Sequence, residues 1–228
     1  MLLQQKRPIT YLITNGETTP QTRPGDKDFS RLLNVVAAAV AAPVNFLQIR
    51  EKNLSTRVLY ELALQAARIT RGSGTRLLIN DRADVARSTG ADGVHLTGRS
   101  IEPSIIRRTF GDEFLIGVST HSLEEARAAC DGGADFAVFG PVFETESKRV
   151  YGNPVGLEKL VQVTAALPEF PLLALGGVTL ENAESCFRAG AAGVAAIRLF
   201  SETNELARVV AKIDERFSSS AQKERHGN

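Results

Sequence analysis

Three segments of the chain share one pattern, in which a helical stretch stops at Gly-Ala and an apolar run follows at once. The three copies begin at Gly90, Gly133 and Gly190. Glycine readily ends a helix, and an apolar run without polar alternation is typical of a strand that is covered on both faces. The repeat therefore predicts a parallel sheet in which strands and helices alternate along the chain.

Continued along the chain, this rhythm gives eight runs of strand length, each followed by a stretch with helical periodicity. The expected strands are residues 10–14, 45–50, 76–80, 93–96, 114–119, 136–139, 172–175 and 193–197. The expected helices are residues 29–41, 55–71, 83–88, 103–109, 122–132, 156–167, 179–189 and 202–217. These units predict an α/β fold, a single (β/α)₈ TIM barrel with a parallel eight-stranded barrel. The alternative, a doubly wound open sheet, uses the same units but commonly fewer of them.

The barrel accounts for residues 1–217 as one domain. Residues 218–228 lack apolar periodicity, and we expect them to form a disordered tail. Residues 141–154 make a connection that is longer than usual between a strand and a helix, which marks a candidate active-site lid.

Composition excludes several classes of protein. Cys130 and Cys186 form no C-x-x-C motif, so they indicate packing and not a disulfide framework or a zinc site. The 27 basic and 26 acidic side chains leave a net charge of +1, and no nucleic-acid partner is expected. No apolar run reaches the about 18 residues of a membrane span, and the amino terminus lacks a signal-peptide core. We expect a cytoplasmic protein without a membrane partner, and the sequence leaves open whether it forms a homo-oligomer.

Polar side chains gather at the carboxyl ends of the expected strands, where TIM barrels have their active sites. Many of them are basic, which favours an anionic ligand. The basic residues are Arg50, Lys52, Arg82, Arg99, Lys148, Arg149 and Arg198. Gly176-Gly177 precedes an expected helix at the usual phosphate site of these barrels, and Arg198 ends the neighbouring strand.

Each of these features also has a purely structural explanation. The basic residues fit a solvated rim, and Asn80 and Asp81 fit the cap of the next helix. His95 lies within an apolar strand, so we expect a hydrogen-bonded interior residue. His121 follows a strand end and is expected to face the barrel mouth.

Six motifs occur in the order seen in thiamin-phosphate synthases and in their TenI-like thiazole-tautomerase relatives. The chain resembles this family from its first to its eighth expected strand. The motifs are QIREK from Gln48, INDR from Ile79, GVHL from Gly93, GVSTHS from Gly117, FGPVF from Phe139 with Thr145-x-Ser147-Lys148, and LGGV from Leu175.

In this family the synthase joins hydroxymethylpyrimidine diphosphate to a thiazole phosphate and releases pyrophosphate. The resemblance implies that Gln48 contacts the pyrimidine and that Asp81 binds Mg²⁺. It assigns the diphosphate to Arg50, Lys52, Asn80, Ser119 and Lys148. It assigns the thiazole phosphate to Thr145, Ser147 and Gly177. Preplaced positive charge would stabilise the charge that develops on the leaving diphosphate.

The chain departs from the synthase pattern at several positions. Ser100 stands where synthases commonly carry a second carboxylate for magnesium, and a hydroxyl is a poorer ligand for this cation. A weakened magnesium site is therefore expected, with Arg99 as an alternative counter-charge to the diphosphate. Arg198 stands where Ser is common in the family. Glu144 stands where many synthases have Pro, and in this the chain is closer to the tautomerase relatives.

The tautomerase relatives relocate a proton on a thiazole carboxylate phosphate, which requires an acid-base group but neither diphosphate nor metal. His121 matches the position implicated there, and imidazole suits proton transfer near neutral pH. Asp81, Lys52 and the Thr-x-Ser-Lys segment favour the synthase, which is our main hypothesis. A non-catalytic sensor of a phosphorylated metabolite is a third hypothesis, because it would share the same binding residues.

Overall fold

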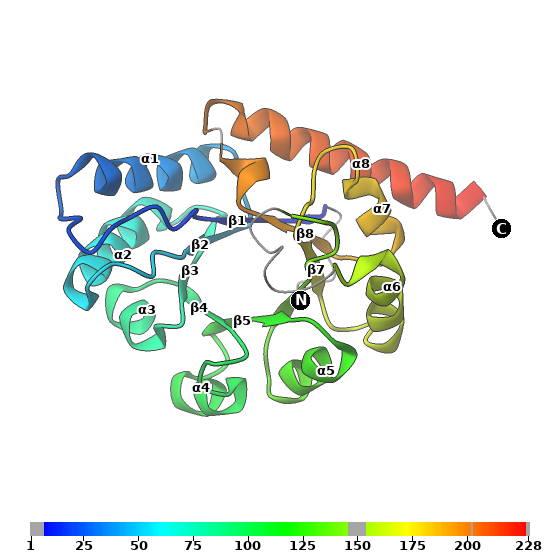
Figure 1. Ribbon diagram of the computed structural model, residues 1–228, viewed down its shortest axis with the longest axis horizontal. Coiled ribbons are helices and arrows are strands. Elements are labelled where there is room, and N and C mark those ends of the chain that lie inside the picture. Colours follow the sequence, from blue (N-terminus) through cyan, green and yellow to red (C-terminus); the bar gives the residue numbers. More distant parts are fainter. Residues whose placement is uncertain (1–6, 146–153, 202, 227–228) are drawn as a thin grey trace.

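The computed structural model describes residues 7–145, 154–201 and 203–226, and its eight parallel strands form one closed barrel (Figure 1). The strands are β1 (Ile9–Ile13), β2 (Phe46–Ile49), β3 (Arg76–Asn80), β4 (Gly93–Leu96), β5 (Leu115–Thr120), β6 (Phe136–Phe139), β7 (Leu172–Leu175) and β8 (Gly193–Ala196). β1 pairs with β2 on one side and with β8 on the other, which closes the sheet. This confirms the predicted TIM barrel and excludes the open doubly wound sheet.

The helices follow one another round the outside of the barrel in chain order (Figure 1). They are α1 (Lys27–Ala41), α2 (Thr56–Thr70), α3 (Ala83–Thr89), α4 (Pro103–Phe110), α5 (Leu123–Asp131), α6 (Gly156–Ala166), α7 (Ala183–Arg188) and α8 (Leu206–His226). Their apolar faces pack on the outward-facing strand residues, of which Leu47, Leu77 and Ile116 are fully buried. All carboxyl ends of the strands therefore meet at one end of the barrel, which we call the mouth.

Each copy of the Gly-Ala repeat ends a helix, and two copies also hydrogen-bond to the preceding strand. The first glycine of each copy has a φ between 77° and 85°, the left-handed conformation that glycine adopts at helix ends: Gly90, Gly133 and Gly190. In two copies the next residue but one is an aspartate. Asp92 accepts the Leu77 N–H at 2.8 Å, and Asp135 accepts the Ile116 N–H at 2.7 Å. The repeat thus builds the turn and fixes the start of the preceding strand.

Aromatic side chains fill the barrel interior below the mouth. The rings of Phe46 and Phe136 stack with their centroids 4.9 Å apart, and Tyr11 meets both edge-on at 5.7 Å and 5.6 Å. A Cβ at Gly117 would lie 2.4 Å from the Phe136 ring, so glycine on β5 makes room for the cluster. This cluster forms a floor beneath the polar side chains of the strand ends.

The start of α7 differs from the sequence-based expectation, which placed it at residue 179. Asn182 instead closes a turn before the helix. Its Oδ1 accepts the Thr179 N–H at 2.8 Å, and its Nδ2 donates to the Gly177 carbonyl oxygen at 2.9 Å. Residues 179–182 form this turn and are not helical, so α7 begins at Ala183.

The end of the last helix also differs, because α8 continues to His226 through most of the segment expected as a disordered tail. The Phe217 ring lies edge-on to Phe187 of α7, with the centroids 5.2 Å apart. This aromatic contact anchors α8 at the expected boundary, and the helix extends beyond it.

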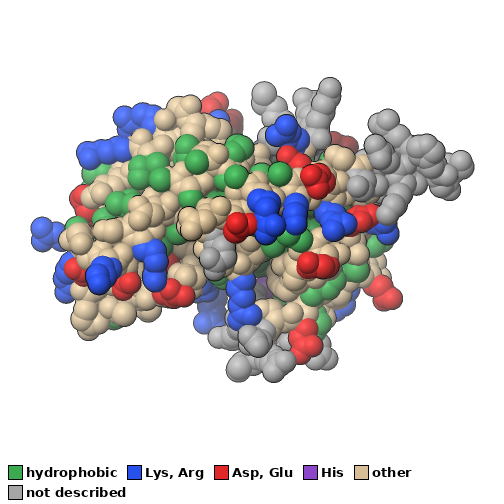
Figure 2. Space-filling model, turned by 90° about the horizontal axis from the view of Figure 1, so that it is seen from above, with side chains coloured by type: hydrophobic (Ala, Val, Ile, Leu, Met, Phe, Trp, Pro, Cys, Tyr) green, Lys and Arg blue, Asp and Glu red, His purple; other side chains and the backbone are tan. Residues whose placement is uncertain are grey.

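The surface carries both signs of charge, and the two cysteines are free packing residues. Acidic and basic side chains lie interspersed over the face that Figure 2 shows. Within the described ranges, no helix combines the length and the apolar character needed to cross a membrane. Both cysteines are free, and burial raises the pKa of the Cys186 thiol to about 12, which fits a packing residue.

Candidate functional site

Five consecutive strands each place one polar side chain in the barrel interior, and hydrogen bonds join the five side chains. On β4, His95 has its Nε2 2.9 Å from the Ser119 hydroxyl and its Nδ1 3.0 Å from the Tyr11 hydroxyl. The Tyr11 hydroxyl lies 3.2 Å from Gln48 Oε1, and Gln48 Nε2 donates to Asn80 Oδ1 at 2.9 Å. We call this continuous series, from Ser119 to Asn80, the interior chain.

The middle of the interior chain is buried and its two ends are half-buried. Tyr11, Gln48 and His95 are 0%, 1% and 2% exposed. Burial, and to a smaller extent the positive charge of Arg50, lowers the pKa of His95 to about 3. Burial also raises the pKa of Tyr11 well above its usual value. Both side chains are therefore neutral near pH 7, and His95 is the interior histidine that the sequence predicted.

Asp81 continues the interior chain into the loop after β3. Its Oδ2 accepts a hydrogen bond from Asn80 Nδ2 at 3.0 Å, and its Oδ1 accepts one from the Ser100 hydroxyl. Its φ of 58° lies in a region that residues other than glycine rarely adopt, and its N–H donates to the His95 carbonyl oxygen at 2.9 Å. Ser100 also accepts the Thr97 N–H at 2.7 Å. The residue that replaces the expected second carboxylate is thus in direct contact with Asp81.

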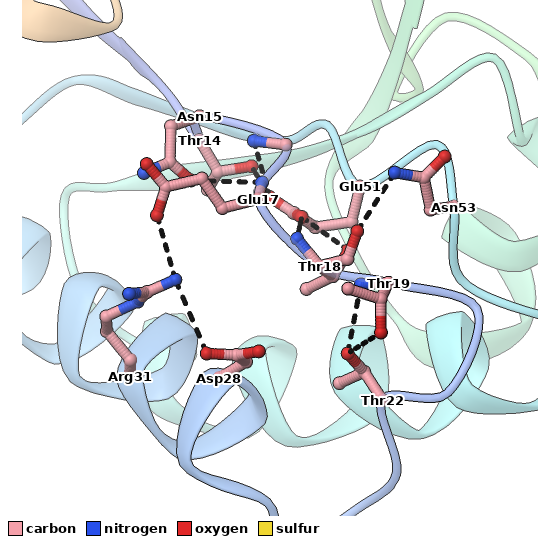
Figure 3. Close-up of polar contacts among 11 residues, drawn as sticks. Thr14, Asn15, Glu17, Thr18, Thr19, Thr22, Asp28, Arg31, Glu51 and Asn53 are labelled. Carbon is pink, nitrogen blue, oxygen red and sulfur yellow. Dashed lines mark hydrogen bonds and ion pairs between the residues drawn. The ribbon is translucent and has the colours of Figure 1, made fainter.

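Glu51 is a structural anchor of the mouth that sequence reasoning missed. Its carboxylate is buried and accepts the hydroxyls of Thr14 and Thr18 at 2.7 Å each (Figure 3). It also accepts the N–H groups of Gly16 and Thr18 at 3.2 Å each, and Asn53 donates to the Thr18 carbonyl oxygen at 2.9 Å. A buried charge requires such donors. Glu51 therefore fastens the loop after β1 to the loop after β2.

This anchor holds the backbone of Arg50, directly after β2. The Arg50 N–H donates to Thr14 Oγ1 at 2.9 Å, next to the Glu51 carboxylate that the same hydroxyl contacts. Lys52, Asn80 and Asp81 line one cavity of about 200 Å³ between the ends of β2 and β3. The structure thus brings a lysine, an amide and a carboxylate to one cavity, with Arg50 beside it in the chain.

On the opposite side of the mouth, the Gly176-Gly177 turn lies against the loop after β6. Gly177 has a φ of 65°, and a Cβ at this position would lie 2.5 Å from the Glu144 carbonyl oxygen. The Phe143 N–H donates to the Gly176 carbonyl oxygen at 3.0 Å. Arg198 begins a 3₁₀ turn one residue after β8, the strand that pairs with β7. Residue 177 must be glycine, because its φ is positive and because the Glu144 backbone lies where a Cβ would be.

The remaining expected residues of this loop are only partly described. Thr145 is half-buried at the end of the described part of the loop. Ser147 and Lys148, and Arg149 after them, lie outside the described residues, so their predicted contacts with substrate stay predictions.

His121 lies between the ends of β5 and β6. Its Nδ1 is hydrogen-bonded to the Gly140 carbonyl oxygen, and its backbone N–H donates to Glu125 Oε2 at 2.6 Å. Because a carbonyl oxygen only accepts, Nδ1 carries the proton of the neutral ring and Nε2 is its proton acceptor. The His121 side chain is exposed at the mouth, as the sequence predicted.

The donor set around Asp81 fits a magnesium ion only in part. Across the described part of the chain, no three His, Cys, Asp or Glu side chains converge on one point. The Asp81 carboxylate keeps lone pairs beyond its two hydrogen bonds. Mg²⁺ is commonly held by one or two carboxylates together with substrate phosphates. The residues therefore fit a magnesium ion shared with a bound diphosphate, not one held by the protein alone.

A closed parallel barrel with a polar mouth of this kind defines a TIM-barrel protein, and the carboxyl ends of its strands are its candidate site. Residues 11–200 match the TMP-TENI family model, described as thiamine monophosphate synthase. This chain belongs to that family, as its sequence motifs indicated.

Relatives and a solved structure agree with the family model. A "Putative thiamine-phosphate synthase" from Geobacter sulfurreducens is 46% identical over 187 residues, 82% of this chain and 84% of the relative. A "Thiamine-phosphate synthase" from Roseiflexus sp. is 37% identical over 189 residues, 83% of this chain and 76% of the relative. The solved "Thiamine phosphate pyrophosphorylase from Pyrococcus furiosus" has a TM-score of 0.72 and 28% identity, and the match covers 90% of this chain and 96% of that one.

The glycine requirement at residue 177 predicts a loss of stability on substitution. Gly177→Ala should lower the free energy of unfolding by about 1–3 kcal/mol, because alanine is strained at this φ and its Cβ meets the Glu144 backbone. The matched control is Gly74→Ala, since a Cβ at Gly74 meets nothing within 4 Å. Urea unfolding of both variants measures the effect, and equal stabilities would contradict the prediction.

The lowered pKa of His95 predicts how stability depends on pH. The imidazole pKa is about 6.5 in the unfolded chain, and burial lowers the pKa of His95 to about 3, so the unfolded chain binds more protons between these values. The contribution of neutral His95 is complete above about pH 6.5 and is lost as the pH falls toward 3, by up to about 1.4 kcal/mol per unit. His95→Gln removes this titration. The stability difference between wild type and variant should shrink from pH 7 to pH 4 in urea unfolding, whereas a constant difference would refute the expectation.

Proposed function

We propose that this protein condenses hydroxymethylpyrimidine diphosphate with a thiazole phosphate to give thiamin phosphate and pyrophosphate. The observation that carries the proposal is the grouping of Lys52, Asn80 and Asp81 around one cavity, beside the buried Gln48 amide. Cationic and amide donors suit a diphosphate. Membership of the thiamine monophosphate synthase family supports the same reaction.

In the proposed reaction, the bond between the pyrimidine methylene carbon and the diphosphate oxygen breaks, and its electron pair leaves with pyrophosphate. The thiazole ring nitrogen donates its lone pair to the same carbon, so the carbon–nitrogen bond forms without removal of a proton. In this proposal Arg50 and Lys52 stabilise the charge that grows on the leaving oxygens. Asp81 would hold a magnesium ion, which when bound supplies further positive charge to the diphosphate. This chemistry needs no strong side-chain base.

The reaction assay uses purified protein, both substrates and magnesium, and detects thiamin phosphate by fluorescence after oxidation. Arg50→Ala should lower kcat/KM on the order of 100-fold, as loss of a transition-state charge contact does. Arg76→Ala is the matched control, because Arg76 begins β3 at the end of the barrel away from the mouth. Absence of product with wild-type protein at saturating magnesium would falsify the synthase function.

The contact between Ser100 and Asp81 leads to a prediction about the metal. Ser100→Asp places a second carboxylate next to Asp81, and an aspartate oxygen can still accept the Thr97 N–H that Ser100 accepts. Magnesium prefers anionic oxygen, so the variant should bind Mg²⁺ in the presence of pyrophosphate about 10-fold more tightly or better. Calorimetric titration of both proteins measures this. Equal affinities would mean that Ser100 does not weaken the site.

Thiazole tautomerisation is the second candidate function, and the orientation of His121 favours it. The hydrogen bond to Gly140 leaves Nε2 as the proton acceptor of an exposed imidazole at the mouth. A general acid or base of this kind contributes roughly 100- to 10,000-fold. His121→Ala should therefore lower tautomerase activity by roughly 100- to 10,000-fold but leave thiamin phosphate formation within a few-fold. A large loss of thiamin phosphate formation in this variant would point to His121 as part of the synthase site.

A further inference from the structure

The two residues that follow β2 continue the alternation of the strand, so their side chains lie on opposite sides of the barrel wall. Phe46 packs in the interior, whereas Leu47 packs against the helices. Counted from these positions, Arg50 falls on the inward side and Glu51 on the outward side. Burial, and after it the positive charge of Arg50, lowers the pKa of His95 to about 3, so the charge of Arg50 acts in the interior.

The Thr14 hydroxyl connects Glu51 with the backbone of Arg50. It donates its proton to Glu51 Oε1 at 2.7 Å, and its oxygen accepts the Arg50 N–H at 2.9 Å. The Thr14 backbone N–H donates to the Gln48 carbonyl oxygen at 3.0 Å. The Thr14 side chain therefore extends the pairing of β1 with β2 by one hydrogen bond beyond the ends of both strands, and the Glu51 carboxylate orients the hydroxyl that makes it.

The loop after β1 also lies directly against the Arg50 side chain. A Cβ at Gly16 would be 3.6 Å from Arg50 Nη1 and 3.3 Å from the Arg50 carbonyl oxygen. The Gly16 N–H donates to Glu51 Oε1 at 3.2 Å, and its φ of 74° is one that glycine adopts readily. Glu51 thus fixes the segment of backbone that borders the guanidinium.

We propose that Glu51 and Thr14 are positioning residues that hold the Arg50 guanidinium in place at the mouth before a diphosphate departs. A cation that is already in place stabilises developing charge without the entropy cost of ordering a long side chain during the reaction. The role of Arg50 toward a diphosphate rests on the proposed function, whereas the restraint of Arg50 by the anchor does not.

Glu51→Gln tests the anchor with almost no change in side-chain volume. The two carboxylate oxygens each accept a backbone N–H, from Gly16 and from Thr18, so either orientation of the amide turns its NH₂ group toward one of these donors. The kcat/KM for thiamin phosphate formation should fall about 10- to 100-fold. Glu17→Gln is the matched control, because Glu17 lies in the same loop in an exposed ion pair with Arg31. An unchanged kcat/KM in Glu51→Gln would overturn the proposal.

The same substitution in an Arg50→Ala background separates positioning from a purely structural role. If Glu51 acts through Arg50, Glu51→Gln should change the kcat/KM of Arg50→Ala by less than about 2-fold, because effects that depend on one shared group are not additive. Losses that multiply in the double variant would mean that Glu51 only supports the fold of the mouth, and the positioning role would be wrong.

Thr14→Val and Thr18→Val form a second matched pair, which decides the question if Glu51→Gln does not fold. Each removes one hydroxyl that donates to Glu51 at 2.7 Å, but only the Thr14 hydroxyl also contacts Arg50. Urea unfolding should show similar losses of stability in both variants. The kcat/KM should fall at least about 10-fold in Thr14→Val and less in Thr18→Val. Equal losses of kcat/KM would contradict the positioning role.

Nitrogen-15 NMR relaxation of the Arg50 Nε–H group measures the restraint in the whole protein without substrate. Arg50→Lys assigns the signal by its loss. We expect a group that is rigid on the picosecond to nanosecond timescale in wild type and more mobile in Glu51→Gln and Thr14→Val. A group that is already mobile in wild type would overturn the proposal.

The relaxation and activity measurements separate this proposal from the proposed function. If wild-type protein forms no thiamin phosphate but both variants release a rigid Arg50, the synthase function fails and the restraint by Glu51 and Thr14 stands. If thiamin phosphate forms but Arg50 stays rigid and kcat/KM is unchanged in both variants, the synthase function stands and the positioning role fails.

Discussion

Closure of the eight-stranded sheet is the constraint on which the rest of this structure depends. Because β1 pairs with β8, alternate residues of every strand point into one shared interior. Three aromatic rings occupy the lower part of that interior: Tyr11, Phe46 and Phe136. Polar side chains above them are removed from water and must satisfy one another. The interior chain from Ser119 to Asn80 is the result, and it gives the mouth a rigid polar base.

Two carboxylates at the mouth have different environments and therefore different roles. Glu51 is surrounded by two hydroxyls and two backbone N–H groups, which use its lone pairs to fasten two loops together. Asp81 accepts from Asn80 and Ser100, keeps further lone pairs and lines the cavity. The first carboxylate holds the framework in place, and the second is available to a ligand or a metal. Glu51 and Asp81 thus differ in role because different groups surround their carboxylates.

Much of the fold was predictable because its signals are local. The bounds of β3, β4, β6 and β7 agree with their apolar runs, and the helix ends agree with the left-handed glycines of the repeat. The start of α7 was not predictable in this way, because Asn182 bonds to Thr179 and Gly177 in a turn that resembles a helix cap in sequence. The length of α8 was also missed, since the contact between Phe217 and Phe187 joins different helices.

The sequence by itself determined the barrel, the family and the residue types at the strand ends, because strand length, glycine position and motif order are all written along the chain. It also identified His95 as an interior histidine, from its place within an apolar strand. Only the tertiary structure decided the partners of these residues. In the sequence, Glu51 is one more charged residue between Arg50 and Lys52. Its role in fastening two loops is visible only in the fold, where Thr14 and Thr18 of the loop after β1 donate to its carboxylate. The hydrogen bonds of the interior chain are likewise not encoded at any one position, because they form only when the eight strands close round one interior.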